Sequence, residues 1–266
     1  MNRCLILLLL GTATSVRWEE SCSAEDGVGA RVAALIPARD GSKGIRRKNL
    51  SRIGNETLLA RALRRIRQSG QFGSVWVSTD GREIAAEAVD HGGRVHWRDP
   101  ATATDEASTL SAVKDFLRYH PEVDVLAVVQ CTSPFLRPEF LTSALRKMTN
   151  NSLDCVFAVT RVFNLRWIES ADGFAKAVNF DPKKRPRRQD WEGELIENGM
   201  FYIFKTELVT RHGVLQNDRC GVLEIPRRYS LEIDDESDLL TARELSRVMD
   251  APTTEEQTGG QPSREL

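Results

Sequence analysis

The segment IPARDGSKGIRRKN, residues 36–49, combines two glycines, a serine and five cationic side chains. It directly follows an apolar run that begins at Val32. Glycines let backbone N–H groups turn toward a bound anion, and Lys and Arg supply positive charge to phosphate groups. A basic glycine loop at the end of a buried strand predicts a phosphate-binding site, with a solvated surface loop as the alternative.

Strand-like and helix-like segments alternate outward from this loop. Short apolar runs predict strands at residues 31–38, 74–80, 123–134, 154–162, 200–205 and 222–226. Amphipathic segments predict helices at residues 56–70, 81–93, 108–120, 139–151 and 235–250. This order is typical of an α/β protein whose doubly wound, mostly parallel sheet is covered by helices on both faces.

Polar turns follow three of the predicted strands, at residues 37–49, 78–80 and 130–134. Ligands of parallel sheets bind at the carboxyl ends of the strands, which lie at one edge of the sheet. We therefore expect these three turns to meet at one crevice.

Composition narrows the classes of function. The chain has 266 residues, 41% of them hydrophobic, and a formal net charge of -1. General binders of nucleic acids or membrane surfaces usually show a basic excess, and this chain has none. Binding of an anionic ligand must therefore depend on local clusters of positive charge.

The two ends of the chain differ from its middle. Residues 1–15, MNRCLILLLLGTATS, show the pattern of a secretory signal peptide, with a short uncleaved anchor as the alternative. The apolar run is too short to cross a bilayer comfortably, so we expect no stable membrane span. Residues 16–30 are expected to be a polar lead-in and residues 251–266 a disordered tail.

Sequons and cysteines bear on the compartment. Three N-x-[ST] sequons start at Asn49, Asn55 and Asn150. A glycan on Asn49 would block the basic loop, so Asn55 and Asn150 are the predicted glycosylation sites. Cys131 and Cys155 lie in strand-like runs and are expected to be buried free thiols. Neither a disulfide framework nor a histidine metal site is indicated by the spacing.

Two acidic residues stand near the other end of the chain. SLEIDDESDL, residues 230–239, places Glu232 and Asp234 two positions apart, on one side of an extended segment. Two such carboxylates are suited to hold Mg²⁺. The alternative is an acidic first turn of the last helix, with Asp234 or Asp235 as its cap.

Residues 163–199 interrupt the alternation and include KKRPRRQDWEGE at 183–194. Such a basic run suits a nuclear localisation signal, a nucleic-acid patch or a site for an anionic ligand. The expected signal peptide argues against the nucleus. A solvated basic face is the alternative.

These stretches together resemble one family. IPARDGSKGIRRKNL, VSTD, VVQCTSP, RPRRQDW, ENGMFYIF and SLEIDDESDL occur in the order and spacing of the cytidylyltransferases that make CMP-sialic acid. The resemblance covers roughly residues 31–250 and implies a Rossmann-like nucleotidyltransferase fold. It also implies transfer of CMP from CTP to the anomeric hydroxyl of sialic acid (N-acetylneuraminate), with release of pyrophosphate, for glycoprotein sialylation.

The resemblance also implies roles for particular residues. The CTP site would comprise Arg39, Ser42, Lys43, Lys48, Asn49, Ser78 and Asp80. The sialic-acid site would comprise Gln130, Arg188, Gln189, Asn198 and Tyr202, with Arg188 on the carboxylate. Lys48, Arg39 and Asp234 would act in catalysis, with Lys48 on the α-phosphate. Glu232 and Asp234 would hold Mg²⁺, or Mn²⁺ as the alternative.

Assembly and location follow from the same resemblance. Members of the family are dimers, and the insertion near residues 160–199 matches the part that reaches into the partner subunit. The expected signal peptide places this chain in the lumen of the secretory pathway, in the Golgi first and the ER as the alternative.

Two departures from the family pattern keep other functions open. Asp40 stands where the family usually has a small or neutral residue, and Glu232 where it usually has Asp. A CTP- or sialic-acid-binding protein with impaired catalysis therefore remains an alternative. A KDO-type cytidylyltransferase is a second alternative, although that group is not expected to share RPRRQDW.

Overall fold

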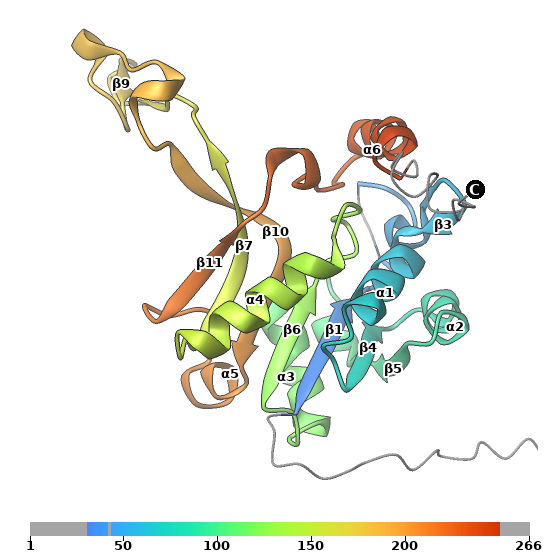
Figure 1. Cartoon of the computed structure of the whole chain (residues 1–266). Coiled ribbons are helices and arrows are strands. Elements are labelled where there is room, and N and C mark those ends of the chain that lie inside the picture. The colour runs from blue at the N-terminus through green and yellow to red at the C-terminus, as the bar shows by residue number, and fades with distance from the viewer. Residues whose placement is uncertain (1–30, 42–43, 251–266) are drawn as a thin grey trace, which may run out of the picture.

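The computed structural model of this chain describes residues 31–41 and 44–250 (Figure 1). The predicted signal peptide (1–15), lead-in (16–30) and tail (251–266) lie outside the described residues. So do Ser42 and Lys43 of the basic loop.

A seven-stranded sheet forms the centre of the molecule, in the order β11-β7-β10-β6-β1-β4-β5 (Figure 1). The strands are β1 (Val32–Pro37), β4 (Ser74–Thr79), β5 (Arg94–Trp97), β6 (Val125–Val129), β7 (Cys155–Val162), β10 (Glu194–Lys205) and β11 (Cys220–Glu224). Neighbouring strands are parallel except that β10 is antiparallel to both β6 and β7. The prediction of a mostly parallel α/β sheet is confirmed.

Helices cover both faces of the sheet. They are α1 (Leu58–Ser69), α2 (Arg82–Asp90), α3 (Thr109–Tyr119), α4 (Pro138–Asn150) and α5 (Glu207–His212), whereas α6 (Glu236–Met249) belongs to a separate apolar cluster. Ala34 and Ile36 of β1 belong to a core with α1, α2 and α4, whereas Ala33 and Leu35 belong to a core with α3 and α5. Alternate residues of a strand point to opposite faces, so the continuous apolar run of β1 reflects burial on both sides.

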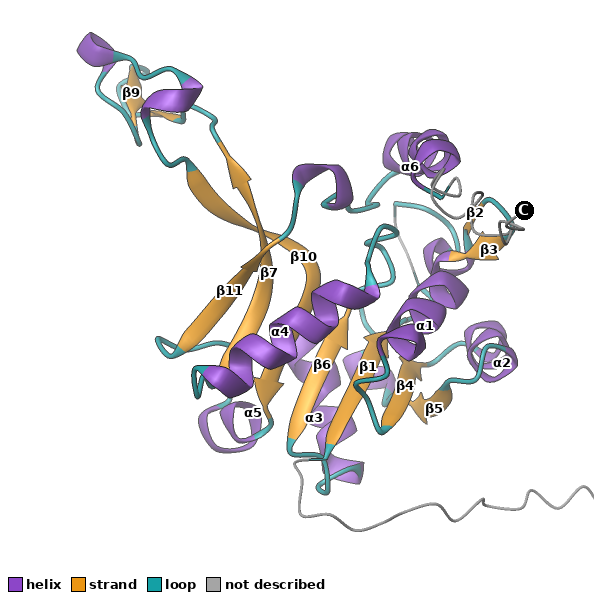
Figure 2. Ribbon diagram, viewed as in Figure 1, coloured by secondary structure: helices purple, strands orange, loops and turns teal. Residues whose placement is uncertain are grey.

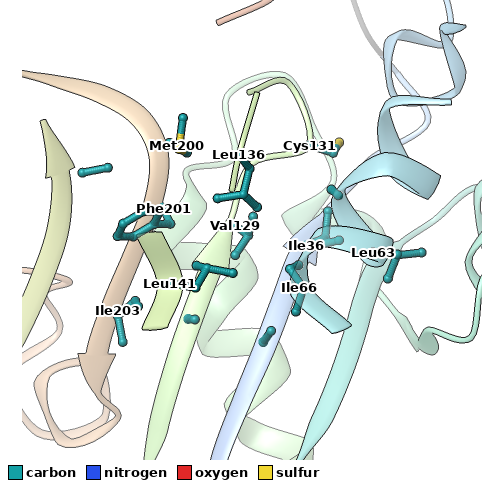
Figure 3. Close-up of a cluster of buried hydrophobic side chains, with 14 of the residues drawn as sticks. Ile36, Leu63, Ile66, Val129, Cys131, Leu136, Leu141, Met200, Phe201 and Ile203 are labelled. Carbon is teal, nitrogen blue, oxygen red and sulfur yellow. The ribbon is translucent and has the colours of Figure 1, made fainter. Parts of the chain in front are cut away.

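Local signals set the ends of the helices. Thr57 caps α1 by accepting the N–H of Ala60, and Gly70 ends the helix at a φ of 64°. Figure 3 shows the core under this helix, where Leu63 and Ile66 meet Ile36 of the sheet. The predicted helices at 56–70, 81–93, 108–120, 139–151 and 235–250 are all present, with ends that differ by a few residues.

A third apolar cluster joins segments that lie far apart in the chain. It joins Ile45 of the basic loop, Ile233 of the acidic segment and Leu239 of α6, together with Ile53, Leu58, Phe135 and Ala242. Residues nearly 200 positions apart in the chain are thus packed together. Close to this cluster lie the short strands β2 (Arg52–Ile53) and β3 (Glu56–Thr57) and the 3-10 helix η1 (Lys48–Leu50).

Residues 163–193 extend away from the sheet at the ends of β7 and β10, and we call them the arm (Figure 2). The arm contains β8 (Trp167–Glu169), β9 (Ala175–Ala177) and the 3-10 helices η3 (Pro182–Lys184) and η4 (Arg188–Asp190). Residues 194–199, expected within the interruption, belong instead to β10. Their register with β7, from Glu194 opposite Val162, continues the sheet into this stretch.

One cysteine prediction is wrong. Cys155 is joined to Cys220 by a disulfide, across the neighbouring parallel strands β7 and β11, with Cα atoms 4.5 Å apart. The pairing depends on β11 lying next to β7, which the sequence separation of 65 residues does not reveal. Cys131 is a buried free thiol, as expected.

Two further 3-10 helices, η2 (Pro100–Thr102) and η5 (Arg227–Tyr229), lie in loops. Among the helices of the described residues, none has the length and apolar content needed to cross a membrane.

Candidate active site

A cavity of about 390 Å³ opens where the basic loop, the turn after β6 and the segment before α6 meet. Its lining residues are Pro37, Arg39, Gly44, Lys48, Asn49, Gln130, Thr132, Glu232 and Asp234. These include predicted members of the CTP, sialic-acid and metal sites. Of the three turns expected to share a crevice, those at 37–49 and 130–134 do so, whereas no residue of 78–80 lines this cavity.

The basic loop is held closely against the acidic segment. A Cβ atom on Gly44 would collide with the carbonyl oxygen of Asp234, so the close approach requires glycine here. Arg47 adopts a left-handed conformation with φ of 57°, and Lys48 N–H donates to the Ile45 carbonyl 3.2 Å away. This turn directs the Lys48 side chain into the cavity.

Lys48 provides the cationic centre of the cavity. Its side chain is only 18% exposed. The ammonium donates to the carbonyl oxygen of Ile233 at 3.0 Å and to Oδ1 of Asp234 at 3.2 Å. The positive charge is therefore held at a defined position between the basic loop and the acidic segment.

Glu232 and Asp234 both line the cavity, while the side chain of Ile233 between them is buried. The Ile233 N–H donates to the Thr132 carbonyl at 2.9 Å, which ties the acidic segment to the turn after β6. The helix cap is Asp235, whose carboxylate accepts the N–H groups of Ser237 and Asp238. Of the two candidate caps, Asp235 therefore caps α6, and the Asp234 carboxylate faces Lys48.

The electrostatics of Glu232 are unusual. Burial, and then the negative charge of Asp234, raise the pKa of the Glu232 carboxyl, while Lys48 opposes the rise. None of the hydrogen bonds among residues 31–41 and 44–250 uses its carboxylate. The single positive charge of Lys48 does not balance the two neighbouring carboxylates, so the pair is suited to a divalent cation. Oxygen is the donor atom that Mg²⁺ prefers. The described part of the chain has no group of three or more His, Cys, Asp or Glu residues arranged as a metal site.

Ser78 and Asp80, predicted to bind CTP, lie at the end of β4, and neither lines the cavity. Ser78 is fully buried. Oδ1 of Asp80 accepts the backbone N–H of Asp40 at 2.8 Å. The Asp40 side chain lies against Gly81, where an added Cβ would come within 2.9 Å of it. The unusual Asp40 is thus placed at the β4 end of the loop, and it does not line the Lys48 cavity.

Arg98, just after β5, was missed from the sequence. It is 7% exposed, and its Nε donates to Oγ of Ser78 at 3.1 Å. Its buried Nη2 has no hydrogen-bond partner among the described residues. This unsatisfied guanidinium lies beside Ser78, a residue predicted to bind CTP, which makes Arg98 a candidate member of the site. The available signal was an arginine directly following a short edge strand, but that strand was itself not predicted.

Asn198 and Gly199 form a bulge in β10. Asn198 is 7% exposed; its Oδ1 accepts the Met200 N–H and its Nδ2 donates to Oγ of Ser230. Gly199 has a φ of 71°, and an added Cβ would lie 2.8 Å from a carboxylate oxygen of Glu232. The bulge therefore ties β10 to the acidic segment and leaves room for Glu232.

Tyr202 follows this bulge, and its hydroxyl donates to Oε2 of Glu197 at 3.0 Å. Burial, together with the charges of Glu197 and Glu232, raises the pKa of the Tyr202 hydroxyl. Tyr202 thus remains a neutral hydrogen-bond donor beside the acidic segment.

Arg188 and Gln189 occupy a different place. Both belong to η4 on the arm and are exposed, and neither lines the cavity. The Arg188 guanidinium lies over the Phe163 ring, 4.8 Å from its centroid. Within one chain, the predicted sialic-acid residues are divided between the sheet and the arm (Figure 1).

The three sequons differ in accessibility. Asn49 is 6% exposed, and its amide nitrogen donates to the Arg39 carbonyl at 3.0 Å. Asn55, between β2 and β3, and Asn150, at the end of α4, are both exposed. The folded chain therefore presents Asn55 and Asn150, while Asn49 is part of the site.

Similarity to known proteins extends over the part of the chain that forms the cavity. The profile of the family described as Cytidylyltransferase matches residues 33–257. The chain is 44% identical over 206 residues to "N-acylneuraminate cytidylyltransferase A" of Danio rerio, covering 76% of this chain and 48% of that protein. It is 42% identical over 213 residues to "N-acylneuraminate cytidylyltransferase" of Oncorhynchus mykiss, covering 79% and 49%. The chain thus spans about half the length of these curated relatives.

The fold is shared with a solved nucleotidyltransferase. The structure of CMP:2-keto-3-deoxy-manno-octonic acid synthetase complexed with CTP matches 83% of this chain and 100% of that chain, with a TM-score of 0.64. The sequence identity is 17%, so this likeness concerns the arrangement of the sheet and helices.

Proposed function

Because this chain belongs to the cytidylyltransferase family, we propose that it transfers CMP from CTP to the anomeric hydroxyl of N-acetylneuraminate and releases pyrophosphate. The observation that carries the proposal is the cavity that gathers Lys48, Gln130, Glu232 and Asp234. It occurs in a chain 44% identical to a protein named as an N-acylneuraminate cytidylyltransferase. The CMP-sialic acid formed would serve glycoprotein sialylation.

The reaction joins two anions, and this explains the local charge. The anomeric oxygen attacks the α-phosphorus of CTP, the bond to the bridging oxygen breaks, and pyrophosphate leaves with the electron pair. Lys48 and Arg39 stabilise the charge that develops on the phosphates. By analogy with the loss of one oxyanion donor, losing one such cation costs about 3 kcal/mol of transition-state stabilisation.

Lys48 is suited to the α-phosphate because its ammonium is already held by the Ile233 carbonyl. A phosphate oxygen would take the place of Asp234 as its anionic partner. Asp234 is the proposed base for the hydroxyl proton, with a metal-held water as the alternative, since the Asp234 carboxylate lines the same cavity and its side chain is 75% exposed. Holding the hydroxyl in line with the leaving group supplies much of the remaining acceleration.

Glu232 and Asp234 would hold Mg²⁺, with Mn²⁺ as the alternative. A bound cation would neutralise part of the negative charge on the triphosphate. Glu232 is one methylene longer than the aspartate usual in the family. The open space at Gly199 accommodates this longer side chain.

A homodimer would complete the sugar-acid site. Gln130, Asn198 and Tyr202 would come from the sheet of one subunit, and Arg188 and Gln189 from the arm of the other. The arm and the adjoining end of β10 expose large apolar side chains, which supports a docking role. These are Trp167, Ile168, Phe174, Val178, Leu195 and Ile196.

The lumen of the secretory pathway is the proposed location, with the Golgi first and the ER as the alternative. The Cys155–Cys220 disulfide supports it, since such bonds persist in oxidising compartments. Glycosylation at Asn55 and Asn150 is proposed with it, and both side chains are exposed.

Binding of CTP without turnover is the second candidate. It is favoured by two departures from the family pattern, Glu232 in place of the usual aspartate and Asp40 near the loop. A KDO-type reaction is less supported, because the likeness to that synthetase is at 17% identity and concerns the fold.

Pyrophosphate release decides between these functions. The purified protein is assayed with CTP and N-acetylneuraminate, or with KDO in its place, and with Mg²⁺ or Mn²⁺. We expect release that needs both CTP and N-acetylneuraminate. Lys48→Ala should slow it by about a hundredfold. Lys114→Ala, which removes an exposed lysine of α3 outside the cavity, is the matched control. Absence of release with either metal, but with CTP binding retained, would support the binding-only function.

A further inference from the structure

A buried thiol lies directly behind the cavity. Cys131 is 2% exposed and follows Gln130 in the turn after β6. Its Sγ lies 3.2 Å from Oδ1 of Asn49, a contact between residues 82 positions apart. We propose that Cys131 is a positioning residue for CTP: its S–H group fixes the Asn49 amide and so holds Arg39 and Lys48 in place for the triphosphate. The inference rests on the proposed function.

The thiol is a permanent donor. Burial raises the pKa of Cys131 to about 12, so the S–H proton is retained throughout the neutral range. A thiol is a weak donor and only a weak acceptor. It therefore favours the carbonyl oxygen of Asn49, and not the amino group, on its side of the amide.

The amide nitrogen of Asn49 makes a second contact, with the backbone of Arg39. Its Nδ2 donates to the Arg39 carbonyl at 3.0 Å, which joins the two ends of the basic loop. A flipped amide would place its oxygen against the carbonyl of Arg39 and its amino group against the thiol. Because Asn49 is 6% exposed, water does not compensate for such a flip. The thiol and the carbonyl together thus specify one orientation.

The contact between Cys131 and Asn49 fixes the position of the basic loop relative to the turn after β6. The loop carries Arg39 and Lys48, and the turn after β6 carries Gln130 and Thr132, all in the lining of the cavity. Cys131 joins these parts from behind without contacting the cavity itself. Loss of the Cys131 thiol should therefore weaken binding of the CTP triphosphate more than it slows the attack by the bound sugar acid.

A pair of substitutions of nearly equal size tests the hydrogen bond. Cys131→Ala removes the donor, whereas Cys131→Ser retains one. We expect Cys131→Ala to raise the KM for CTP about fivefold, the scale of one neutral hydrogen bond, with kcat and the sugar-acid KM changed less than about twofold. Cys131→Ser should stay within about twofold of the wild type. Equal KM values for Ala, Ser and wild type would overturn the proposal.

Two further measurements separate positioning from simple destabilisation. Val156→Ala creates a small cavity in the same core, away from the loop, and should lower the melting temperature without changing the KM for CTP. Alkylation of Cys131 in the wild type, followed by peptide mapping, reports opening of the loop without any need for turnover. CTP at ten times its Kd should slow this alkylation about tenfold.

The outcomes distinguish the two proposals. A wild type that binds CTP and releases no pyrophosphate contradicts the proposed function, while the alkylation result still decides the role of Cys131. Alkylation that is unchanged by bound CTP contradicts the positioning role, whatever the activity.

Discussion

Glu232 carries a stability cost that its proposed role as a metal ligand would explain. Its carboxylate lies partly buried beside Asp234, and both effects raise its pKa above the ordinary value of 4.5. The folded protein therefore binds this proton more tightly than the unfolded chain. The cost is absent below pH 4.5, grows as the pH rises from 4.5 through the higher folded-state pKa, and is fully present above that pKa.

Glu232→Gln should consequently raise the melting temperature at pH 7 while it abolishes pyrophosphate release. The difference from the wild type should narrow as the pH falls through the raised pKa toward 4.5, and stay constant below 4.5. Added Mg²⁺ should raise the melting temperature of the wild type but not of the variant, because only the wild type retains both carboxylates. Glu139→Gln, at an exposed carboxyl of α4, is the control. A variant less stable than the wild type at pH 7 would contradict this account.

Gly199 tests the space left for that carboxylate. Gly199→Ala places a Cβ 2.8 Å from Glu232, at a φ of 71°, whereas Gly70→Ala has a similar φ of 64° and open space around it. Both variants should lose about 1–2 kcal/mol of unfolding free energy because of the left-handed backbone. Only Gly199→Ala should also raise the Mg²⁺ concentration for half-maximal activity. If both variants need the same Mg²⁺ concentration as the wild type, Gly199 does not shape the metal site.

At the scale of elements, the edge strand β11 directs the chain toward the acidic segment. Its disulfide to β7 joins strands that are already in register, at Cys220 opposite Cys155. Beyond β11, Ile225 N–H donates to the Val159 carbonyl at 2.7 Å, and η5 then leads to Glu232. The bond therefore secures the end of the sheet from which the acidic segment begins.

Removal of this bond should lower stability. We expect Cys220→Ser to lose about 2–4 kcal/mol of unfolding free energy, the usual range for a loop of this size. Reductant should lower the unfolding midpoint of the wild type toward that of the variant and leave the variant unchanged. Thiol titration of the denatured, unreduced protein with peptide mapping checks the bond directly. A reactive Cys155 thiol in that titration would show that the disulfide does not form.

At the scale of the whole molecule, the arm separates Arg188 and Gln189 from the cavity of the same chain. Apolar side chains on the arm are strongly exposed, with Phe174 at 70% and Ile168 at 54%. Both observations suit a site shared between two subunits.

Mixed dimers test this sharing. Lys48→Ala inactivates the cavity of one chain and Arg188→Ala the arm of the other, so a mixed dimer would contain one intact site. Random pairing of the two inactive variants should restore about a quarter of the wild-type sites. Mixing Lys48→Ala with Gln130→Ala, both in the cavity, should restore none. Failure of the first mixture, with dimers verified by sedimentation, would contradict completion by the partner.

Short-range features could be predicted because they depend on neighbouring residues. The apolar run of β1 and the apolar stripe of α1 report which residues are buried. The glycine at position 70 reports a left-handed backbone at the end of α1. The family resemblance added Lys48, Gln130, Glu232 and Asp234, which the structure brings into one cavity. Their roles remain predictions that the experiments above address.

The sequence by itself determined the alternation of strands and helices, the basic loop and the acidic pair, because each arises from residues close together in the chain. Only the tertiary structure decided that Gly44 meets the Asp234 carbonyl, that Cys155 pairs with Cys220, and that Arg98 has a buried N–H with no partner in residues 31–41 and 44–250. These features depend on strand order and on packing between distant segments, which local periodicity does not encode.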